Sequence, residues 1–277
     1  MKVGIIIICT NAYFILGLRF IKHFMKYYIG KNAIEFIVFS DIDPKPFLPN
    51  IRNINHIPLS NKSWVDATNS KFTSIVSLEL SDYDHLYYFD ADTDIDKPFD
   101  DWFLGDIVGG EHFNNSSPGE KEFDRNSKSK AYIPLDTHLP QMYYLGAFFG
   151  GTRDNMIRLV KTLIENQTID KLIPYEPRWN DESYINQYFH YIPPSKTIPI
   201  SEFKFIISDK GGIENMRNSS LDIQKYKDEI LKNPITPFKL QNGILSFEME
   251  GGANMKMKHA SKKTKKRRRI KKASNKN

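Results

Sequence analysis

Apolar runs alternate with amphipathic stretches over the first third of the chain, and this alternation predicts its fold class. Residues 3–10 are almost entirely apolar and rich in isoleucine, which is typical of a strand buried on both faces of a sheet. Apolar side chains recur at helical spacing over residues 12–28, and Gly30 marks the expected end of that helix. Further strands are expected at 34–39, 53–58 and 85–89, and a further helix at 63–80. Strands and helices in this order predict a parallel, right-handed, doubly wound α/β sheet.

The pattern changes after Pro98. A short apolar stretch ends at Ile107 and Val108, where Gly109 and Gly110 are expected to break it. The polar segment 114–130 predicts a mobile loop. The elements expected beyond it are a strand at 143–151, a helix at 152–166, a helix that follows 179–183 and runs through 188, and a final strand at 196–199.

Two aspartates follow the predicted strand 85–89 directly. In open α/β sheets, ligands bind at the carboxyl ends of the strands, which is where Asp90 and Asp92 are expected. Mn²⁺ and Mg²⁺ prefer oxygen ligands and keep phosphate oxygens in their remaining positions, so the pair predicts a metal clamp for a nucleotide diphosphate. The alternative is an acidic surface turn, because Asp is common in turns and further aspartates follow, at positions 94, 96, 100 and 101.

Two other motifs carry candidate chemistry. Residues 143–151 crowd aromatic side chains between small ones, which suits a buried strand whose backbone approaches a ligand closely; the alternative is a core strand with a glycine bulge. Further on, Trp179 lies beside two carboxylates, Asp181 and Glu182. The alternative there is an ordinary helix start, in which Asn180 or Asp181 caps the helix and the dipole favours an acid in the first turn.

Charge separates the body of the 277-residue chain from its end. The net charge is +6, but 12 Lys and Arg residues and no acid lie from Lys256 onward, which leaves 27 basic against 33 acidic residues in the body. The body therefore does not resemble a nucleic-acid surface, and we expect disorder from residue 251 onward. A single cysteine, Cys9, excludes an intramolecular disulfide and fits a reducing compartment.

Neither a signal peptide nor a transmembrane helix is predicted. The apolar run 3–10 is too short to span a bilayer, and no small-residue cleavage site follows it. We therefore expect a soluble, cytoplasmic protein whose basic tail could direct it to the nucleus or to an anionic surface.

The motifs, in this order and at this spacing, resemble the family-6 retaining glycosyltransferases, which include the histo-blood-group A and B transferases and α-1,3-galactosyltransferase. They are Asp-Ala-Asp at 90–92, Ser-Lys-Ala-Tyr-Ile-Pro at 129–134, the aromatic segment 143–151, and Trp-Asn-Asp-Glu-Ser at 179–183. The resemblance covers residues 3–218 and implies a GT-A type, Rossmann-like nucleotide-sugar transferase fold with a mostly parallel central sheet flanked by helices. It implies one catalytic domain over 1–250, with a nucleotide-binding half at 1–98, an acceptor-binding half at 99–250 and a basic disordered tail at 251–277.

The resemblance also implies roles for individual residues. Asp90 and Asp92 match the clamp for Mn²⁺, or Mg²⁺, and the diphosphate, and Glu182 matches the catalytic carboxylate. Residues matching UDP contacts are Ile8, Cys9, Thr10, Tyr13, Lys210 and Arg217. Residues matching donor-sugar contacts are Trp64, Asp66, Lys71, Leu145, Ala147 and Asp181. Trp179 matches an acceptor contact, and His112 is a candidate for another. Lys71 stands where the family has Arg, so a bidentate contact becomes a point charge.

The implied reaction moves galactose or N-acetylgalactosamine from its UDP-sugar to a galactose-containing oligosaccharide, including fucosylated, H-antigen-like acceptors, in an α-1,3 linkage. Leu145 resembles the N-acetylgalactosamine-using members and Ala147 the galactose-using ones, so a relaxed enzyme is expected. Bacterial relatives often carry Asn-x-Asn at the clamp, whereas this chain keeps both aspartates and is expected to need metal. Residues 109–124 depart from the family pattern, which leaves the acceptor open. The alternatives are a non-catalytic glycan- or nucleotide-binding module and a nucleic-acid-associated protein acting through its tail; the main reading requires no nucleic acid.

Overall fold

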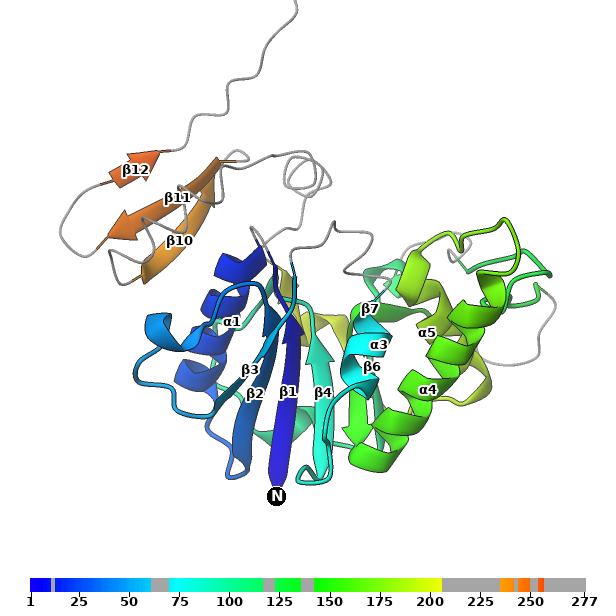
Figure 1. Ribbon diagram of the computed structural model, residues 1–277, viewed down its shortest axis with the longest axis horizontal. Helices are drawn as coiled ribbons and strands as arrows, with labels where there is room; N and C mark the ends of the chain where they lie inside the picture. Colours follow the sequence, from blue (N-terminus) through cyan, green and yellow to red (C-terminus); the bar gives the residue numbers. More distant parts are fainter. Residues whose placement is uncertain are drawn as a thin grey trace, which may run out of the picture. The chain divides into compact units, whose positions relative to one another are not determined.

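The computed structural model describes residues 1–10, 13–60, 70–116, 123–135, 142–205, 235–241, 244–249 and 254–256 (Figure 1). The chain falls into two compact units, 1–234 and 235–277. In the second unit, β10 (Ile235–Gln241), β11 (Ile244–Met249) and β12 (Asn254–Lys256) form an antiparallel sheet. The strand expected at 196–199 is therefore not the last one, and β12 lies in the segment for which disorder is expected. The domain boundaries as a whole stay a prediction.

The first unit is built on a seven-stranded sheet with the order β3-β2-β1-β4-β7-β6-β8. Its strands are β1 (Lys2–Ile8), β2 (Ala33–Ser40), β3 (Ile54–Pro58), β4 (His85–Phe89), β6 (Ile107–Glu111), β7 (Tyr144–Thr152) and β8 (Lys196–Ile198). The first four strands pair in parallel, β7 runs antiparallel to both β4 and β6, and β6 is parallel to β8. The mostly parallel sheet predicted from the apolar runs is confirmed, and its first three strand positions agree with the prediction to within two residues.

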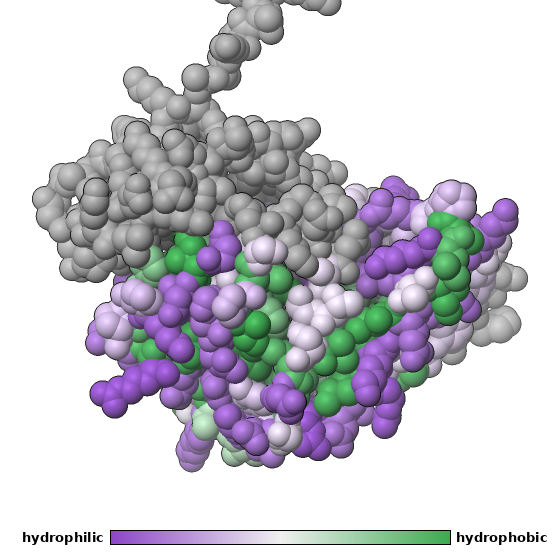
Figure 2. All heavy atoms as spheres, in the orientation of Figure 1, coloured by the Kyte–Doolittle hydropathy of each residue, from purple (hydrophilic) through white to green (hydrophobic). Residues whose placement is uncertain are grey.

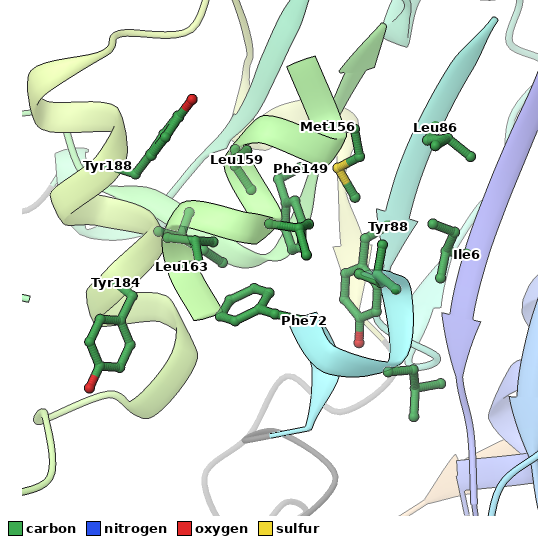
Figure 3. Packing of buried hydrophobic residues seen from close by; sticks show 14 of the residues in the cluster. Ile6, Phe72, Leu86, Tyr88, Phe149, Met156, Leu159, Leu163, Tyr184 and Tyr188 are labelled. Carbon is green, nitrogen blue, oxygen red and sulfur yellow. The ribbon is translucent and has the colours of Figure 1, made fainter. Parts of the chain in front are cut away.

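Helices pack on both faces of this sheet. The longer ones are α1 (Tyr13–Tyr27), α4 (Arg153–Asp170) and α5 (Asn180–Tyr191). The helix expected at 63–80 is described only from residue 70 onward, where α3 (Lys71–Val76) ends four residues earlier than predicted. On one face, Phe24 of α1 packs edge-to-face against Phe36 and Phe89. On the other face, α3, α4 and α5 bury Phe72, Leu159 and Tyr184 with strand residues in one cluster (Figure 3). The sheet is thus doubly covered, as predicted.

The surface formed by the helices on the α4 side of the sheet carries both apolar and polar residues. An apolar band follows α4 among polar residues (Figure 2). Ile157 and Ile164 of this helix are only partly buried, whereas Met156 and Leu163 belong to the core. No helix in the described ranges is long and apolar enough to cross a bilayer.

The Gly109–Gly110 pair was predicted to end the strand that contains Ile107 and Val108, and that prediction is wrong. Both glycines lie inside β6 and are buried. A Cβ at Gly109 would lie 2.8 Å from a ring carbon of Tyr144, and one at Gly110 would lie 3.1 Å from Phe203. Glycine is needed here because aromatic rings pack directly on the strand backbone.

A bulge interrupts β7 where the site forms. Gly109 pairs with Phe149, but Glu111, two residues further along β6, pairs with Tyr144, five residues back along β7. The extra residues of β7 lie at 145–148, and the bulge lets Tyr144 and Phe149 enter the same core cluster. The bulge that the alternative reading expected is present, and bulges commonly re-aim side chains beside active sites.

Two short elements complete the unit near the turn after β4. β5 (Thr93–Asp94) pairs antiparallel with β9 (Lys204–Phe205). Single 3₁₀ turns lie at η1 (Lys45–Phe47), η2 (Asp101–Phe103), η3 (Phe113–Ser116) and η4 (Ile200–Glu202). The turn between β4 and β5 is thereby held at both ends.

Candidate active site

The site begins at Asp90, directly after β4. The Asp90 backbone N–H donates to the Ala147 carbonyl at 2.9 Å, which docks the turn on the bulge of β7. The Asp90 carbonyl accepts from the Thr93 N–H at 3.0 Å, so the chain reverses directly after the strand. The Tyr88 hydroxyl donates to Asp90 Oδ1 at 2.7 Å. Strand, turn and bulge together fix the position of this carboxylate.

Lys71, the first residue of α3, connects this turn to α5. Its side chain is buried, with only 4% of the residue exposed. The ammonium donates to Asp181 Oδ2 at 2.5 Å and to the Gly146 carbonyl at 3.1 Å, and lies 3.4 Å from Asp90 Oδ1. Burial alone lowers the pKa of Lys71, but the charges of Asp181 and Asp90 outweigh it and raise the pKa above its ordinary value. Lys71 is therefore a charged counter-ion between two carboxylates of the site.

Glu182 lies in the first turn of α5 and is held by two donors. The Gly146 N–H donates to Oε2 at 2.8 Å, and the Tyr143 hydroxyl donates to Oε1 at 2.9 Å. A Cβ at Gly146 would lie 3.0 Å from Glu182 Cβ, so a glycine is required for this approach. Burial raises the pKa of Glu182 to about 7, although both hydrogen bonds act in the opposite direction. Such a value is typical of catalytic carboxyls.

The start of α5 is strained. Asn180 has a φ of +44°, the only positive φ outside glycine among the described residues. Asn tolerates this left-handed conformation better than most residues, yet such strain persists only where the surrounding structure imposes it. Asp181 and Glu182 follow directly, so the strained residue sets the direction in which both carboxylates leave the helix.

Asp92 is the second aspartate of the turn. Burial, and after it the charge of Asp90, raise its pKa to about 7. Within the described ranges, no group of three or more His, Cys, Asp or Glu side chains could hold a metal ion. Two carboxylates are nevertheless the donor set for a hard cation that takes its other ligands from a diphosphate and from water. The chemistry of this pair fits Mn²⁺ or Mg²⁺.

The two residues predicted to contact the acceptor sugar, His112 and Trp179, lie near Glu182. The backbone N–H of His112 donates to the Tyr143 carbonyl at 3.0 Å, and the rings of the two residues pack edge-to-face with their centroids 5.0 Å apart. Burial lowers the pKa of His112 to about 4, so the imidazole is neutral at pH 7. Trp179, at the N-terminus of α5, is 44% exposed. The structure thus places His112 against Tyr143, and Tyr143 against Glu182. The exposed Trp179 lies at the N-terminus of the helix that carries Glu182.

The residues predicted to contact UDP on the first strand are largely buried. The Cys9 N–H donates to the Phe39 carbonyl at 2.8 Å, and a Cβ at Gly17 would lie 2.6 Å from the Cys9 sulfur, so this side chain packs against α1. Burial raises the pKa of the Cys9 thiol, which stays protonated. Ile8 and Thr10 are buried as well, while Tyr13, which opens α1, is partly exposed. Any contact of Cys9 with a nucleobase would have to come from its backbone.

The two residues expected to select the donor sugar differ in exposure. Leu145 is buried and would contact a Cβ at Gly110, whereas Ala147 is partly exposed beside Asp90. Four other predicted residues lie outside the described residues, namely Trp64, Asp66, Lys210 and Arg217. Their roles stay predictions.

The surface-turn alternative does not hold for Asp94. This residue is 4% exposed and accepts from Arg19 Nη2 at 2.7 Å, with His23 Nδ1 also at 2.7 Å. Sequence reasoning missed two residues of the site, Tyr88 and Tyr143, each of which donates to a predicted site carboxylate. The only signal for them was the crowding of tyrosines in both motifs.

Comparison with known proteins adds an independent finding. The model described as Glycosyltransferase family 6 matches residues 1–216. The chain is 25% identical over 206 residues to Histo-blood group ABO system transferase 2 of Rattus norvegicus, covering 71% of this chain and 61% of that protein. It is 26% identical over 216 residues to Globoside alpha-1,3-N-acetylgalactosaminyltransferase 1 of Gallus gallus, covering 72% and 60%.

A bacterial protein is also similar. The chain is 24% identical over 206 residues to O-antigen biosynthesis glycosyltransferase WbnI of Escherichia coli, covering 70% of this chain and 84% of that protein. By contrast, the chain spans about three fifths of the length of the animal relatives.

Proposed function

The chain belongs to glycosyltransferase family 6, and from this premise we propose that it is a retaining, divalent-metal-dependent glycosyltransferase. The proposed donor is UDP-galactose or UDP-N-acetylgalactosamine, and the proposed acceptor is a galactose-containing oligosaccharide that becomes linked α-1,3. The names of the similar proteins support this class: two act in the ABO and globoside systems, and one acts in O-antigen biosynthesis.

One observation carries the proposal, namely the convergence of the site on Gly146. Its carbonyl accepts from Lys71, its N–H donates to Glu182, and Lys71 bridges Asp181 and Asp90. Residues of α3, β7 and α5 therefore meet at this point of the backbone, and Lys71 links it to Asp90, the residue after β4. A core strand without a ligand would not need a carboxyl with a raised pKa and a buried lysine there.

In this proposal the groups have separate tasks. Asp90 and Asp92 would hold the cation, which when bound would neutralise charge on the departing UDP. Lys71 adds a fixed positive charge near that position, and Asp181 is placed to accept from donor-sugar hydroxyls. The bond from the anomeric carbon to UDP breaks, a bond to the acceptor oxygen forms, and the acceptor hydroxyl proton is released.

Glu182 is the proposed catalytic carboxylate. Two hydrogen bonds fix its orientation, so it can face the anomeric carbon without losing rotational freedom during the reaction. In its ionised form it either attacks that carbon or stabilises an oxocarbenium-like state. With a pKa of about 7, the ionised form accumulates as the pH rises through neutrality.

The test is a donor screen. UDP-galactose, UDP-N-acetylgalactosamine, UDP-glucose and UDP-N-acetylglucosamine are each incubated with the protein and lactose, with Mn²⁺ or with EDTA. We expect Mn²⁺-dependent transfer from the first two donors, with the α-anomer in the product by NMR. UDP-sugar binding without transfer or hydrolysis would contradict the proposal and point to a non-catalytic binding module.

A further inference from the structure

We propose that Asp124 is a positioning residue that sets the acceptor side of the site through the segment leading into Trp179. This inference rests on the proposed function, because it assigns Trp179 to acceptor binding. Within the described part of the chain, none of the hydrogen-bond partners of the Asp124 carboxylate is a residue that holds the donor in that proposal. Its role would be to orient the residue that the acceptor meets.

Asp124 is buried, with 2% of the residue exposed, and its carboxylate is fully engaged by the chain around it. Oδ2 accepts from the Tyr175 hydroxyl at 2.6 Å and from the backbone N–H of Arg178 at 3.1 Å. Oδ1 accepts from the Asn126 N–H at 3.0 Å. One carboxylate thus ties its own turn to the backbone directly before Trp179. Hydrogen bonds to charged acceptors are the stronger kind, so this tie is rigid.

The neighbouring residue, Phe123, supports the site from a second side. Its ring packs 5.1 Å from Tyr143, whose hydroxyl donates to Glu182. Ile133 joins these two rings in a small buried cluster, and its N–H donates to the Asp124 carbonyl at 3.0 Å. The sequence predicts a mobile loop at 114–130, and that stays a prediction. Its described residues Phe123 and Asp124 contact the tyrosine that donates to Glu182 and the backbone directly before Trp179.

A second buried carboxylate that binds the same segment of the chain provides a matched control. Asp170, also 2% exposed, accepts from the Ser129 hydroxyl at 2.6 Å, the Lys130 N–H at 2.8 Å and the Tyr184 hydroxyl at 2.9 Å. It has the same burial and number of donors as Asp124, but none of its donors adjoins Trp179. A general loss of stability should therefore affect both variants alike, whereas loss of positioning should affect only one.

The kinetic test compares Asp124→Ala with Asp170→Ala at a temperature where both are folded, using UDP-galactose, Mn²⁺ and lactose. We expect Asp124→Ala to raise the KM for lactose about tenfold, since small misplacements of positioning groups have effects of this order or larger. The KM for UDP-galactose should stay unchanged, and so should both constants in Asp170→Ala. Asp124→Asn should restore part of the loss, because its amide oxygen can still accept from the Arg178 N–H.

A second readout needs no activity. Trp179 is one of three tryptophans, so Trp64→Phe with Trp102→Phe leaves it as the only indole. In that background, Asp124→Ala should make Trp179 fluorescence more accessible to acrylamide, and Asp170→Ala should not. Equal effects of the two variants on lactose KM and on quenching would overturn the inference. Failure of the unaltered protein to transfer sugar would overturn the proposed function instead, and the quenching result would still decide whether Asp124 holds this segment.

Discussion

Asp92 and Asp94 lie two residues apart after β4, yet their surroundings are opposite. Asp94 points back toward α1, where Arg19 and His23 hold both of its oxygens at 2.7 Å. Burial alone would raise the pKa of Asp94, but these two partners lower it to about 2. Asp92 is buried beside the like charge of Asp90, and burial and then this charge raise its pKa to about 7. One end of the turn is an anchor held by ion-pair and hydrogen-bond partners, and at the other end two carboxylates lie close together.

Glu182 belongs with Asp92 in this comparison. Both are acids with pKa values near 7, whereas Asp94 is paired with Arg19 and His23. Carboxylates that stabilise a fold are usually paired with cations or donors, and carboxylates kept for ligands are held in unfavourable surroundings. The predictions below test whether that division separates anchor residues from site residues.

The largest effect is expected for Glu182→Gln. The amide keeps the size of the side chain but removes the charge that would face the anomeric carbon. We expect kcat to fall by about 10³-fold, the loss typical when a main electrostatic group is removed. Tyr143→Phe, which removes one donor to Glu182, should lower kcat less. Steady-state kinetics with Mn²⁺ decides this; a Glu182→Gln enzyme with nearly unchanged kcat would remove Glu182 from the site.

Asp92→Asn should affect metal use without affecting folding. We expect Mn²⁺-stimulated turnover to fall by about 10²-fold, because one of the two charged oxygen ligands is lost. Titration of Mn²⁺ followed by electron paramagnetic resonance in the presence of UDP should show weaker binding. Asp94→Asn is the matched control, and its Mn²⁺ titration should resemble that of the unaltered protein. Full metal-dependent turnover in Asp92→Asn would sink the clamp.

The two ends of this turn also show how far the sequence could predict the structure. The strand 3–10 and the aspartates after residue 89 were predictable because apolar runs and turn acids are local signals. The resemblance to family 6 is confirmed by the family match. That Asp94 pairs with Arg19 was not predictable, since the two residues are 75 positions apart and no local rule joins them. Partners of this kind are set by tertiary packing.

Glycines were the other source of error. From the sequence alone, Gly109 and Gly110 predicted the end of a strand, because glycine in a strand interior weakens it. Their real use depends on Tyr144 and Phe203, which pack on the backbone from distant positions. The motif 143–151 suggested close approach of a backbone, but only the fold reveals that Gly146 meets Glu182 and Lys71. Local patterns thus singled out residues that lie close together in the fold, and long-range contacts supplied their arrangement.

Asp94→Asn should lower stability and leave catalysis in place. The folded-state pKa of Asp94, about 2, lies below its ordinary value of 3.8, so its ion pairs stabilise the protein above that ordinary value and are lost as the pH falls toward 2. We expect a loss of about 2 kcal/mol in the free energy of unfolding at pH 7. Urea unfolding measures this directly. Between pH 4 and pH 2 the gap between the two proteins should close, and a constant gap would contradict the assignment.

The smallest effect concerns the donor sugar, and it asks whether sugar selection belongs to the same region as Asp90. The carbonyl of Ala147 accepts from the Asp90 N–H at 2.9 Å, so its methyl group is held close to the clamp, and the residue is partly exposed. One methyl group in a pocket is worth about 1–3 kcal/mol of discrimination. Ala147→Gly should therefore shift preference toward UDP-N-acetylgalactosamine by roughly tenfold or more.

The measurement is kcat/KM for UDP-galactose and UDP-N-acetylgalactosamine in both proteins, with the Mn²⁺ dependence followed as a control for damage to the clamp. Glycine also loosens a strand, but a general loosening would lower both values of kcat/KM together and leave their ratio unchanged. Only a methyl group that faces the donor can change the ratio, because the two sugars differ at the 2-position alone. An unchanged ratio would mean that the bulge of β7 turns Ala147 away from the sugar, and that donor selection lies elsewhere than beside Asp90.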